Sequence, residues 1–238
     1  MRDILSGQIK TFKESPFKSR EFNSWLKESS LWMSVYSCLR VKGVEMDKRQ
    51  LVDVLSGGIV EDLPIDVYNF VINYKELYKD MQACVSMQMS LDEKLIKRFS
   101  DILFGEDEYR KSNPIIYKWG YIAPHFNEMG SMLTEALRHN LHVEDAVDRA
   151  VDAHNAIAAI YPFGENSPVI ALAALYYVLM NEGIPLPAIT ADFEEYNRIM
   201  RSDFEEHTNE FELMIERSLI NRLDSVISLG READGLDS

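Results

Sequence analysis

Hydrophobic side chains recur at intervals of three and four residues between Ser30 and Tyr78. This is the interval at which residues return to one face of an α-helix. The pattern is interrupted at Gly43, at the cluster Ser56–Gly58 and at Pro64, residue types at which helices usually end or begin. The pattern therefore predicts three helices in this part of the chain.

The pattern then predicts one more helix, followed by a change of structure. The helix runs from about Ser90 to Phe104, with Ser90 as its N-cap and Glu93 completing a capping box. Residues 105–124 are rich in β-branched and aromatic side chains and are interrupted by Pro and Gly. This composition is typical of strands and turns, and it predicts a short hairpin within residues 113–123.

Helical spacing returns after the hairpin. It predicts helices over Phe126–Leu137 and Val143–Ile160, and a third over Val169–Asn181. The third segment is apolar on almost every side, so we expect it to be the most buried helix. Gly183 and Pro185 follow it, as expected at the carboxyl end of a helix.

The last part of the chain, Asp192–Leu229, reads as charged helices that carry an apolar stripe. We expect these helices to pack on the core or on a partner, and the final GREADGLDS to fray. The predicted fold class is all-α with one small β-hairpin. We divide the chain into an N-terminal helical region 1–89, a core 90–190 and a C-terminal part 191–238, with no linker long enough to separate independent domains.

Composition and charge exclude several classes of protein. The longest apolar stretch, Val169–Met180, is shorter than the roughly 18 residues that a membrane span needs. The amino end has no secretory-type apolar core, so a cytoplasmic protein with reduced cysteines at Cys38 and Cys84 is expected. The net charge of -14 repels phosphates, so neither nucleic acid nor membrane is an expected partner.

One segment carries a resemblance to a known family. Residues 153–172 read AHNAIAAIYPFGENSPVIAL, in which two predicted helices join through a tight turn. This segment resembles the core of the Fic family, whose signature is HPFx(D/E)GNGRxxR. Two flanking segments, VLSGGIVEDLPIDVYNFVINYKEL and GEDEYRKSNPIIYKWGYIAPHFNEM, are similar to other parts of that fold. The resemblance covers about Trp32 to Arg217 and implies a Fic-like helical bundle with a hairpin flap.

The resemblance also implies an activity, and the sequence departs from it. Family members mostly transfer AMP from ATP to a protein hydroxyl, with the signature histidine as general base. Tyr161 stands at that position here. A phenol with a pKa near 10 is a poor base at neutral pH. We keep one hypothesis open, in which a neighbouring Lys or Arg lowers the pKa of Tyr161 and makes it a base or a nucleotide acceptor.

The implied phosphate-binding loop is altered as well. Its equivalents here are Phe163, Gly164, Glu165, Asn166 and Ser167. Glu165 keeps the acidic position and alone would hold Mg²⁺ only weakly. Pro168 has no N–H to offer a phosphate, and Val169 and Leu172 stand where the family has arginines. No Lys or Arg occurs between Arg149 and Arg198, so only Arg110, Lys111 and Lys118 from the predicted flap remain as candidates.

Two further features follow from the resemblance. Many Fic proteins have an inhibitory helix whose glutamate pairs with the second signature arginine. Here Lys42 stands at the glutamate position, in the segment 37–43. The implied flap places Ile115, Ile116, Tyr117 and Trp119 where target proteins would dock, and exposed aromatic side chains often anchor interfaces.

The remaining histidines have ordinary interpretations. His154 lies on a predicted buried helix face and is expected to be a hydrogen-bonded core residue. His139 and His142 form an HxxH pair without a supporting cluster, which favours a solvated helix end over a metal site.

The sequence thus predicts a Fic-like protein with a degenerate AMP-transfer site. We expect it to be inactive or nearly so, to need no cofactor, and to act as a regulatory or protein-binding module whose partner is another protein. The alternative is an active Fic-type nucleotidyltransferase that uses ATP and Mg²⁺ with altered residues. A third function left open is a structural subunit that forms homo-oligomers through its charged C-terminal helices.

Overall fold

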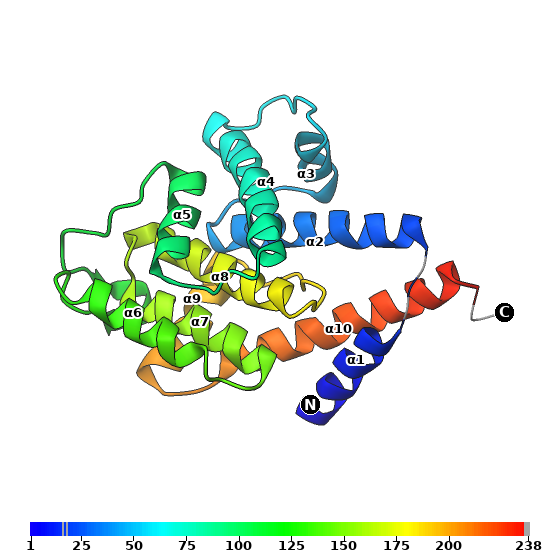
Figure 1. Ribbon diagram of the computed structural model, residues 1–238. Coiled ribbons are helices and arrows are strands. Elements are labelled where there is room, and N and C mark those ends of the chain that lie inside the picture. Colours follow the sequence, from blue (N-terminus) through cyan, green and yellow to red (C-terminus); the bar gives the residue numbers. More distant parts are fainter. Residues whose placement is uncertain (16, 18, 236–238) are drawn as a thin grey trace.

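The computed structural model describes residues 1–15, 17 and 19–235. In this part of the chain, helices make up the body of the molecule (Figure 1), and one short hairpin accompanies them. The elements are α1 (Arg2–Glu14), α2 (Arg20–Val41), α3 (Lys48–Leu55), α4 (Ile65–Ser86), α5 (Glu93–Phe104), β1 (Ile115–Ile116), the 3-10 turn η1 (Tyr117–Trp119), β2 (Tyr121–Ile122), α6 (Met129–Asn140), α7 (Ala146–Ile160), the 3-10 turn η2 (Gly164–Asn166), α8 (Ser167–Asn181), α9 (Phe193–Glu205) and α10 (Glu210–Ala233). The all-α prediction with one hairpin is confirmed.

Helix α8 forms the centre of the molecule. It packs against α7 on one side and against α2, α4 and α5 on others (Figure 1). Every residue from Ser167 to Leu179 is buried, which confirms the prediction that this helix is the most buried. A helix that is apolar on all sides is stable only when other helices cover it. Even so, no described helix is both long and apolar enough to cross a membrane.

The hairpin is antiparallel, with Ile115 opposite Ile122 and Ile116 opposite Tyr121. Its position agrees with the predicted flap. The start of α5 differs from the prediction, because Asp92 is its N-cap and accepts a hydrogen bond from the Leu95 amide at 2.8 Å. Besides accepting this bond, the Asp92 carboxylate interacts favourably with the positive end of the helix.

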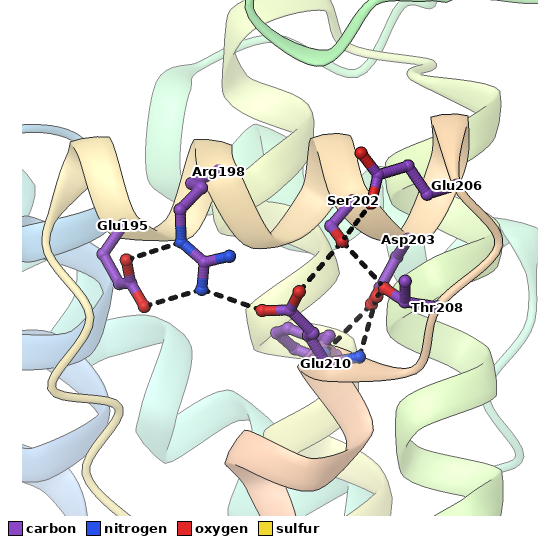
Figure 2. Close-up of polar contacts among 8 residues, drawn as sticks. Glu195, Arg198, Ser202, Asp203, Glu206, Thr208 and Glu210 are labelled. Atoms are coloured by element: carbon purple, nitrogen blue, oxygen red, sulfur yellow. Dashed lines mark hydrogen bonds and ion pairs between the residues drawn. The ribbon is translucent and has the colours of Figure 1, made fainter.

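Helices α9 and α10 are joined by a polar turn (Figure 2). The side chain of Asp203 in α9 accepts hydrogen bonds from the backbone amides of Glu210 and Phe211, at 2.8 and 3.0 Å. It also accepts one from the Thr208 hydroxyl. Arg198 of α9 pairs with Glu210 at 2.8 Å. A residue of one helix therefore caps the next, and the two helices are fixed to each other.

The carboxyl-terminal end is more ordered than the sequence suggested. Helix α10 continues through Ala233, whereas fraying was expected from Gly230 onward. A Cβ atom at Gly230 would lie 2.4 Å from the Phe17 ring, so the glycine allows that ring to lie directly on the helix backbone. This contact covers the end of α10. Residues 236–238 of the predicted frayed segment lie outside the described residues.

Helix α1 was not singled out by the sequence, and it packs along α10 (Figure 1). Leu5 is buried in this contact. The Arg2 guanidinium contacts four carboxylates on α10 and at the start of α7, those of Asp145, Asp148, Glu212 and Glu216. A single arginine thus fixes the first turn of the chain to two other helices.

Candidate functional site

The turn between α7 and α8 holds the residues that the sequence singled out. Helix α7 ends at Ile160, and its C-cap residue Tyr161 has a left-handed backbone at φ 54. The turn η2 follows, and α8 begins at Ser167. The Ser167 hydroxyl accepts a hydrogen bond from the Phe163 amide at 2.9 Å, so it stabilises the turn and does not cap α8. Asn166 is the N-cap of α8, and its side chain makes no capping hydrogen bond.

Tyr161 is buried beside the flap. Its ring meets the Trp119 ring edge to face, with the ring centres 5.5 Å apart. No described group lies within ordinary hydrogen-bond distance of its hydroxyl, although the Glu165 carboxylate is close enough to interact with it. Burial raises the pKa of Tyr161, and the nearby carboxylate of Glu165 raises it further, while Arg110 opposes this only weakly. This direction is opposite to the one that the hypothesis of a basic Tyr161 requires.

Glu165 pairs with a lysine of the flap. The Nζ atom of Lys118 lies 2.8 Å from Oε2 of Glu165. The Glu165 side chain is 81% exposed. Desolvation acts to raise its pKa, but the hydrogen bond and charge of Lys118 lower it overall. The same ammonium group lies 5.6 Å from the centre of the Trp119 ring and 5.4 Å from that of Phe193. The acidic position of the turn therefore already has a cation from this chain as its partner.

The other two basic candidates, Arg110 and Lys111, bond to backbone carbonyl groups and to Glu108. The Arg110 side chain donates hydrogen bonds to backbone carbonyl groups on both sides of the site: Tyr161 at 2.9 Å, Pro124 at 2.5 Å, Ile160 at 3.3 Å and Ser112. Its own amide donates to the Pro162 carbonyl at 2.8 Å. Lys111 pairs with Glu108. Arg110 thus joins the flap loop to the turn, because its planar fork of donors matches several carbonyl groups at once.

The residues that the resemblance places at arginine and inhibitory-glutamate positions are Val169, Leu172 and Lys42. Val169 and Leu172 are buried in the core. Lys42 caps the carboxyl end of α2, and its Nζ atom lies 5.4 and 5.2 Å from the ring centres of Phe70 and Phe104. Burial lowers the pKa of Lys42. No ion pair joins positions 42 and 172, since residue 172 is a leucine.

A small cavity lies between these elements. Its volume is about 150 Å³, and its walls include Lys42, Lys118, Glu165, Pro168 and Val169. Pockets for drug-sized ligands usually measure roughly 300–1,000 Å³. The structure thus brings Lys42 and the α7–α8 turn to one place, as the resemblance implied, but the space between them is narrow.

The flap differs from the predicted docking surface. Trp119 and Ile116 are buried, and the Trp119 indole donates to Oδ1 of Asn197 at 2.8 Å. These two side chains therefore offer a docking protein almost no exposed surface, contrary to the exposure expected for Trp119. The side chains that face solvent are Ile115, Tyr117 and Ile122, which are 50%, 82% and 70% exposed. Strand alternation puts Ile115 and Ile122 on the outer side of the hairpin and turns Ile116 inward.

His154, Tyr196 and Phe211 form a buried cluster, of which the sequence predicted only the burial of His154. His154 is buried as expected, and its Nε2 atom is 3.0 Å from the Tyr196 hydroxyl. Its ring stacks on Phe211 with the centres 3.8 Å apart. Tyr196 belongs to the apolar stripe expected along the last helices, which gave no sign of its contact with His154. Asn197 gave no signal at all, because its partner Trp119 comes from a distant segment.

Metal ligation has no support among the described residues, where no group of three or more His, Cys, Asp or Glu side chains is arranged to hold an ion. His139 and His142 are exposed at the end of α6. Both cysteines are free and buried, as expected.

No family model matches the chain, and no curated protein matches its sequence. Solved structures do match. Fic-1 from C. elegans superposes with a TM-score of 0.82 at 16% identity, over 98% of this chain and 73% of that one. The chain has the Fic fold.

Two bacterial structures agree. A Fic family protein from Desulfovibrio desulfuricans G20 has a TM-score of 0.77 at 14% identity, over 95% of this chain and 74% of that one. A Fic domain containing signaling protein from Bacteroides thetaiotaomicron has a TM-score of 0.73 at 16% identity, over 97% of both chains. The Fic fold therefore covers nearly the whole chain, including the described helices at its two ends.

Proposed function

We propose that this protein is a Fic-fold module that binds another protein and does not transfer AMP. The observation that carries the proposal is the state of Tyr161. At the position of the family's general base stands a buried phenol whose pKa is raised by burial and by Glu165. A group that keeps its proton at neutral pH cannot take one from an attacking hydroxyl.

The surroundings fit a magnesium–triphosphate complex poorly. Glu165 would be the carboxylate for the metal, and it already pairs with Lys118. Val169 and Leu172 offer the phosphates no charge, and both are buried in the core. Pro168 lacks an N–H at the start of α8, where phosphates otherwise find amide donors. Each loss of this kind typically costs about a hundredfold or more in rate, so little transfer is expected.

The flap supports the protein-binding part of the proposal. Ile115, Tyr117 and Ile122 are well exposed on a hairpin that is otherwise firmly held. Trp119, Arg110 and Lys118 fix it from beneath through Asn197, backbone carbonyl groups and Glu165. A rigid hairpin that presents apolar and aromatic side chains loses little entropy when a partner binds.

Calorimetric titration with ATP and Mg²⁺ tests the absence of nucleotide binding. We expect no heat of binding up to millimolar ATP with the wild-type protein. The variant Lys118→Ala removes the ion-pair partner of Glu165 and so makes this carboxylate available to a metal ion. We expect this variant to bind no nucleotide either, because the phosphate donors are missing. A submillimolar dissociation constant for the wild type would favour the active nucleotidyltransferase instead.

Matched substitutions of exposed residues test the flap. Tyr117→Ala and Ile115→Ala should abolish a specific interaction found by affinity capture and confirmed with purified partner. Leu141→Ala is the control, because Leu141 is 50% exposed, like Ile115, but lies at the end of α6. A partner whose affinity is unchanged in both flap variants would contradict the assignment of the flap as the binding surface.

A further inference from the structure

A cavity lies at the carboxyl end of α8, the end opposite to the α7–α8 turn. Its volume is about 480 Å³, and small-molecule sites usually measure roughly 300–1,000 Å³. Its walls come from the end of α4, the connection to α5, the end of α6, and parts of α7 and α8. It shares no lining residue with the small cavity beside Lys42 and Lys118. A ligand here would therefore be bound independently of the α7–α8 turn.

The charged side chains that line this cavity neutralise each other. They are Arg149 and Glu182, one of each sign, and they form an ion pair. Arg149 also donates to the Val143 carbonyl at 2.8 Å, and Lys13, which does not line the cavity, lies 3.9 Å from Glu182. An ionic ligand would lose its hydration on entry without gaining an unpaired countercharge from the described lining residues. The cavity therefore favours an uncharged ligand.

Asn140 supplies a free hydrogen-bond acceptor in the wall. The residue is only 2% exposed, and its Nδ2 atom donates to the Arg149 carbonyl at 2.7 Å and to Oδ2 of Asp152 at 3.0 Å. These two bonds fix the orientation of the side-chain amide. Its Oδ1 atom accepts no hydrogen bond within the described ranges, yet it is not fully enclosed. Since nearly all buried polar atoms are hydrogen-bonded, this oxygen requires a donor from a ligand or from water.

Apolar side chains line the same cavity. Leu91 and Val178 are buried, whereas Met89 and Leu141 are 36% and 50% exposed. The Tyr177 hydroxyl donates to the Met89 carbonyl and so fixes the segment that carries Met89. Thioether side chains make favourable contacts with aromatic rings, and a ring that covers Met89 and Leu141 removes apolar surface from water.

We propose that this cavity binds a small uncharged aromatic molecule that carries one N–H or O–H group, of the indole or phenol class. That group donates a hydrogen bond to Oδ1 of Asn140, and the ring lies against Met89 and Leu141. Burial of the ring supplies most of the affinity, and the hydrogen bond distinguishes the ligand from rings of the same shape that lack a donor.

Indole is a suitable probe, and benzofuran, which has the same shape but no N–H, is the matched control. Calorimetry should give a dissociation constant for indole on the order of 0.5 mM, a modest value for so small a ligand. Benzofuran should bind about fivefold more weakly, the effect of one neutral hydrogen bond. Amide chemical shifts in NMR spectra should change at Met89, Leu91 and Leu141 and stay constant at Tyr117 on the flap.

An alanine substitution tests the acceptor. Asn140→Ala should bind indole and benzofuran equally, because the oxygen is gone, while its affinity for benzofuran stays within about twofold of the wild type. A variant that fails to fold would bind neither ligand, so a structural failure is distinguishable from loss of the acceptor.

A larger side chain at the mouth tests the location without touching Asn140. Leu141→Trp should weaken indole binding about tenfold, because the indole side chain occupies part of the cavity. Met132→Trp is the matched control, because Met132 is 39% exposed on α6 and does not line the cavity.

The proposal is overturned if indole does not bind at millimolar concentration or if the wild type binds indole and benzofuran equally. It is also overturned if Asn140→Ala keeps the preference for indole, or if Leu141→Trp and Met132→Trp lose indole affinity equally. Chemical-shift changes confined to other parts of the chain would place the ligand elsewhere and would have the same consequence. Urea unfolding of each variant excludes loss of the fold as the cause of weaker binding.

Discussion

His154 is a titratable residue that is completely buried. It has no exposed surface, and its ring lies between the Tyr196 hydroxyl and the Phe211 ring. Its Nδ1 atom is 2.9 Å from Oδ1 of Asn155. Burial lowers the pKa of His154 from 6.5 to about 3, although Asn155 acts in the opposite direction. The folded protein therefore keeps this histidine neutral.

The lowered pKa predicts a loss of stability on the acid side. Between about pH 6.5 and pH 3 the unfolded chain takes up a proton at His154 that the folded chain does not, so stability falls as the pH falls. This residue alone should lower the free energy of unfolding by about 1.5 kcal/mol from pH 6.5 to pH 5. In His154→Gln that part of the pH dependence should disappear. Urea unfolding at the two pH values measures the difference.

Between pH 6.5 and pH 5, the effect of His154 on stability can be distinguished from that of the carboxylates. The carboxyl groups with lowered pKa, those of Glu93, Glu165, Glu195 and Glu210, titrate below their ordinary value of 4.5. They add to the loss of stability only at lower pH. An unchanged slope between pH 6.5 and pH 5 in His154→Gln would show that another group causes it.

Two buried tyrosines near the site should respond differently to removal of the hydroxyl. The Tyr161 hydroxyl has no hydrogen-bond partner among the described residues, so Tyr161→Phe should change the free energy of unfolding by less than about 0.5 kcal/mol. The Tyr196 hydroxyl contacts His154, so Tyr196→Phe should cost about 1 kcal/mol. Chemical denaturation of the pair measures both values, and equal losses would contradict the bonding described.

At the scale of elements, the boundaries of the helices depend on contacts between neighbours. Helix α10 begins at Glu210, although its own N-cap residue, Asn209, makes no capping bond with its side chain. Asp203 of α9 supplies the cap. The first turn of α10 carries Phe211, which lies against His154. By fixing the first turn of α10, the Asp203 cap holds Phe211 against His154.

Removal of this cap should loosen the start of α10. Asp203→Ala should lower the free energy of unfolding by about 1–2 kcal/mol and speed hydrogen exchange at the amides of Glu210 and Phe211. Glu206→Ala is the control, because Glu206 only accepts a long bond of 3.4 Å from Ser202. Similar effects of the two substitutions would argue against a specific cap.

At the scale of the whole molecule, ion pairs between side chains hold α1 against α7 and α10. Arg2 faces carboxylates from α7 and α10, and one of them, Glu216, is only 2% exposed. Without Arg2 this carboxylate would be buried and unpaired. A buried carboxylate without a cation is costly, whereas pairs of exposed side chains contribute little.

Loss of Arg2 should therefore detach α1. Arg2→Met should lower the free energy of unfolding by about 2 kcal/mol and expose the amides of α1 to hydrogen exchange. Lys10→Met on the same helix should have almost no effect, because the Lys10 and Glu14 side chains are 74% and 67% exposed. Unchanged exchange protection of α1 in Arg2→Met would contradict the prediction.

Much of the fold could be predicted from the sequence. The burial of α8 followed from its uniform apolar composition, and the hairpin followed from β-branched and aromatic residues between Pro and Gly. The exact caps could not be predicted, because Ser90 and Asp92 are both good N-cap residues and only the local geometry chooses between them. Trp119 was placed on the surface because an indole on a hairpin gives no sign of which side it faces.

The sequence by itself determined the residue types at and after the α7–α8 turn. The proposal that AMP transfer is absent rests on the types of Tyr161, Pro168, Val169 and Leu172 and on the resemblance, and it was made without coordinates. Only the tertiary structure decided how the remaining groups pair. Lys118 lies 47 residues from Glu165, and Asn197 lies 78 residues from Trp119. Contacts over such separations depend on the packing of whole helices, which periodicity along the chain does not encode.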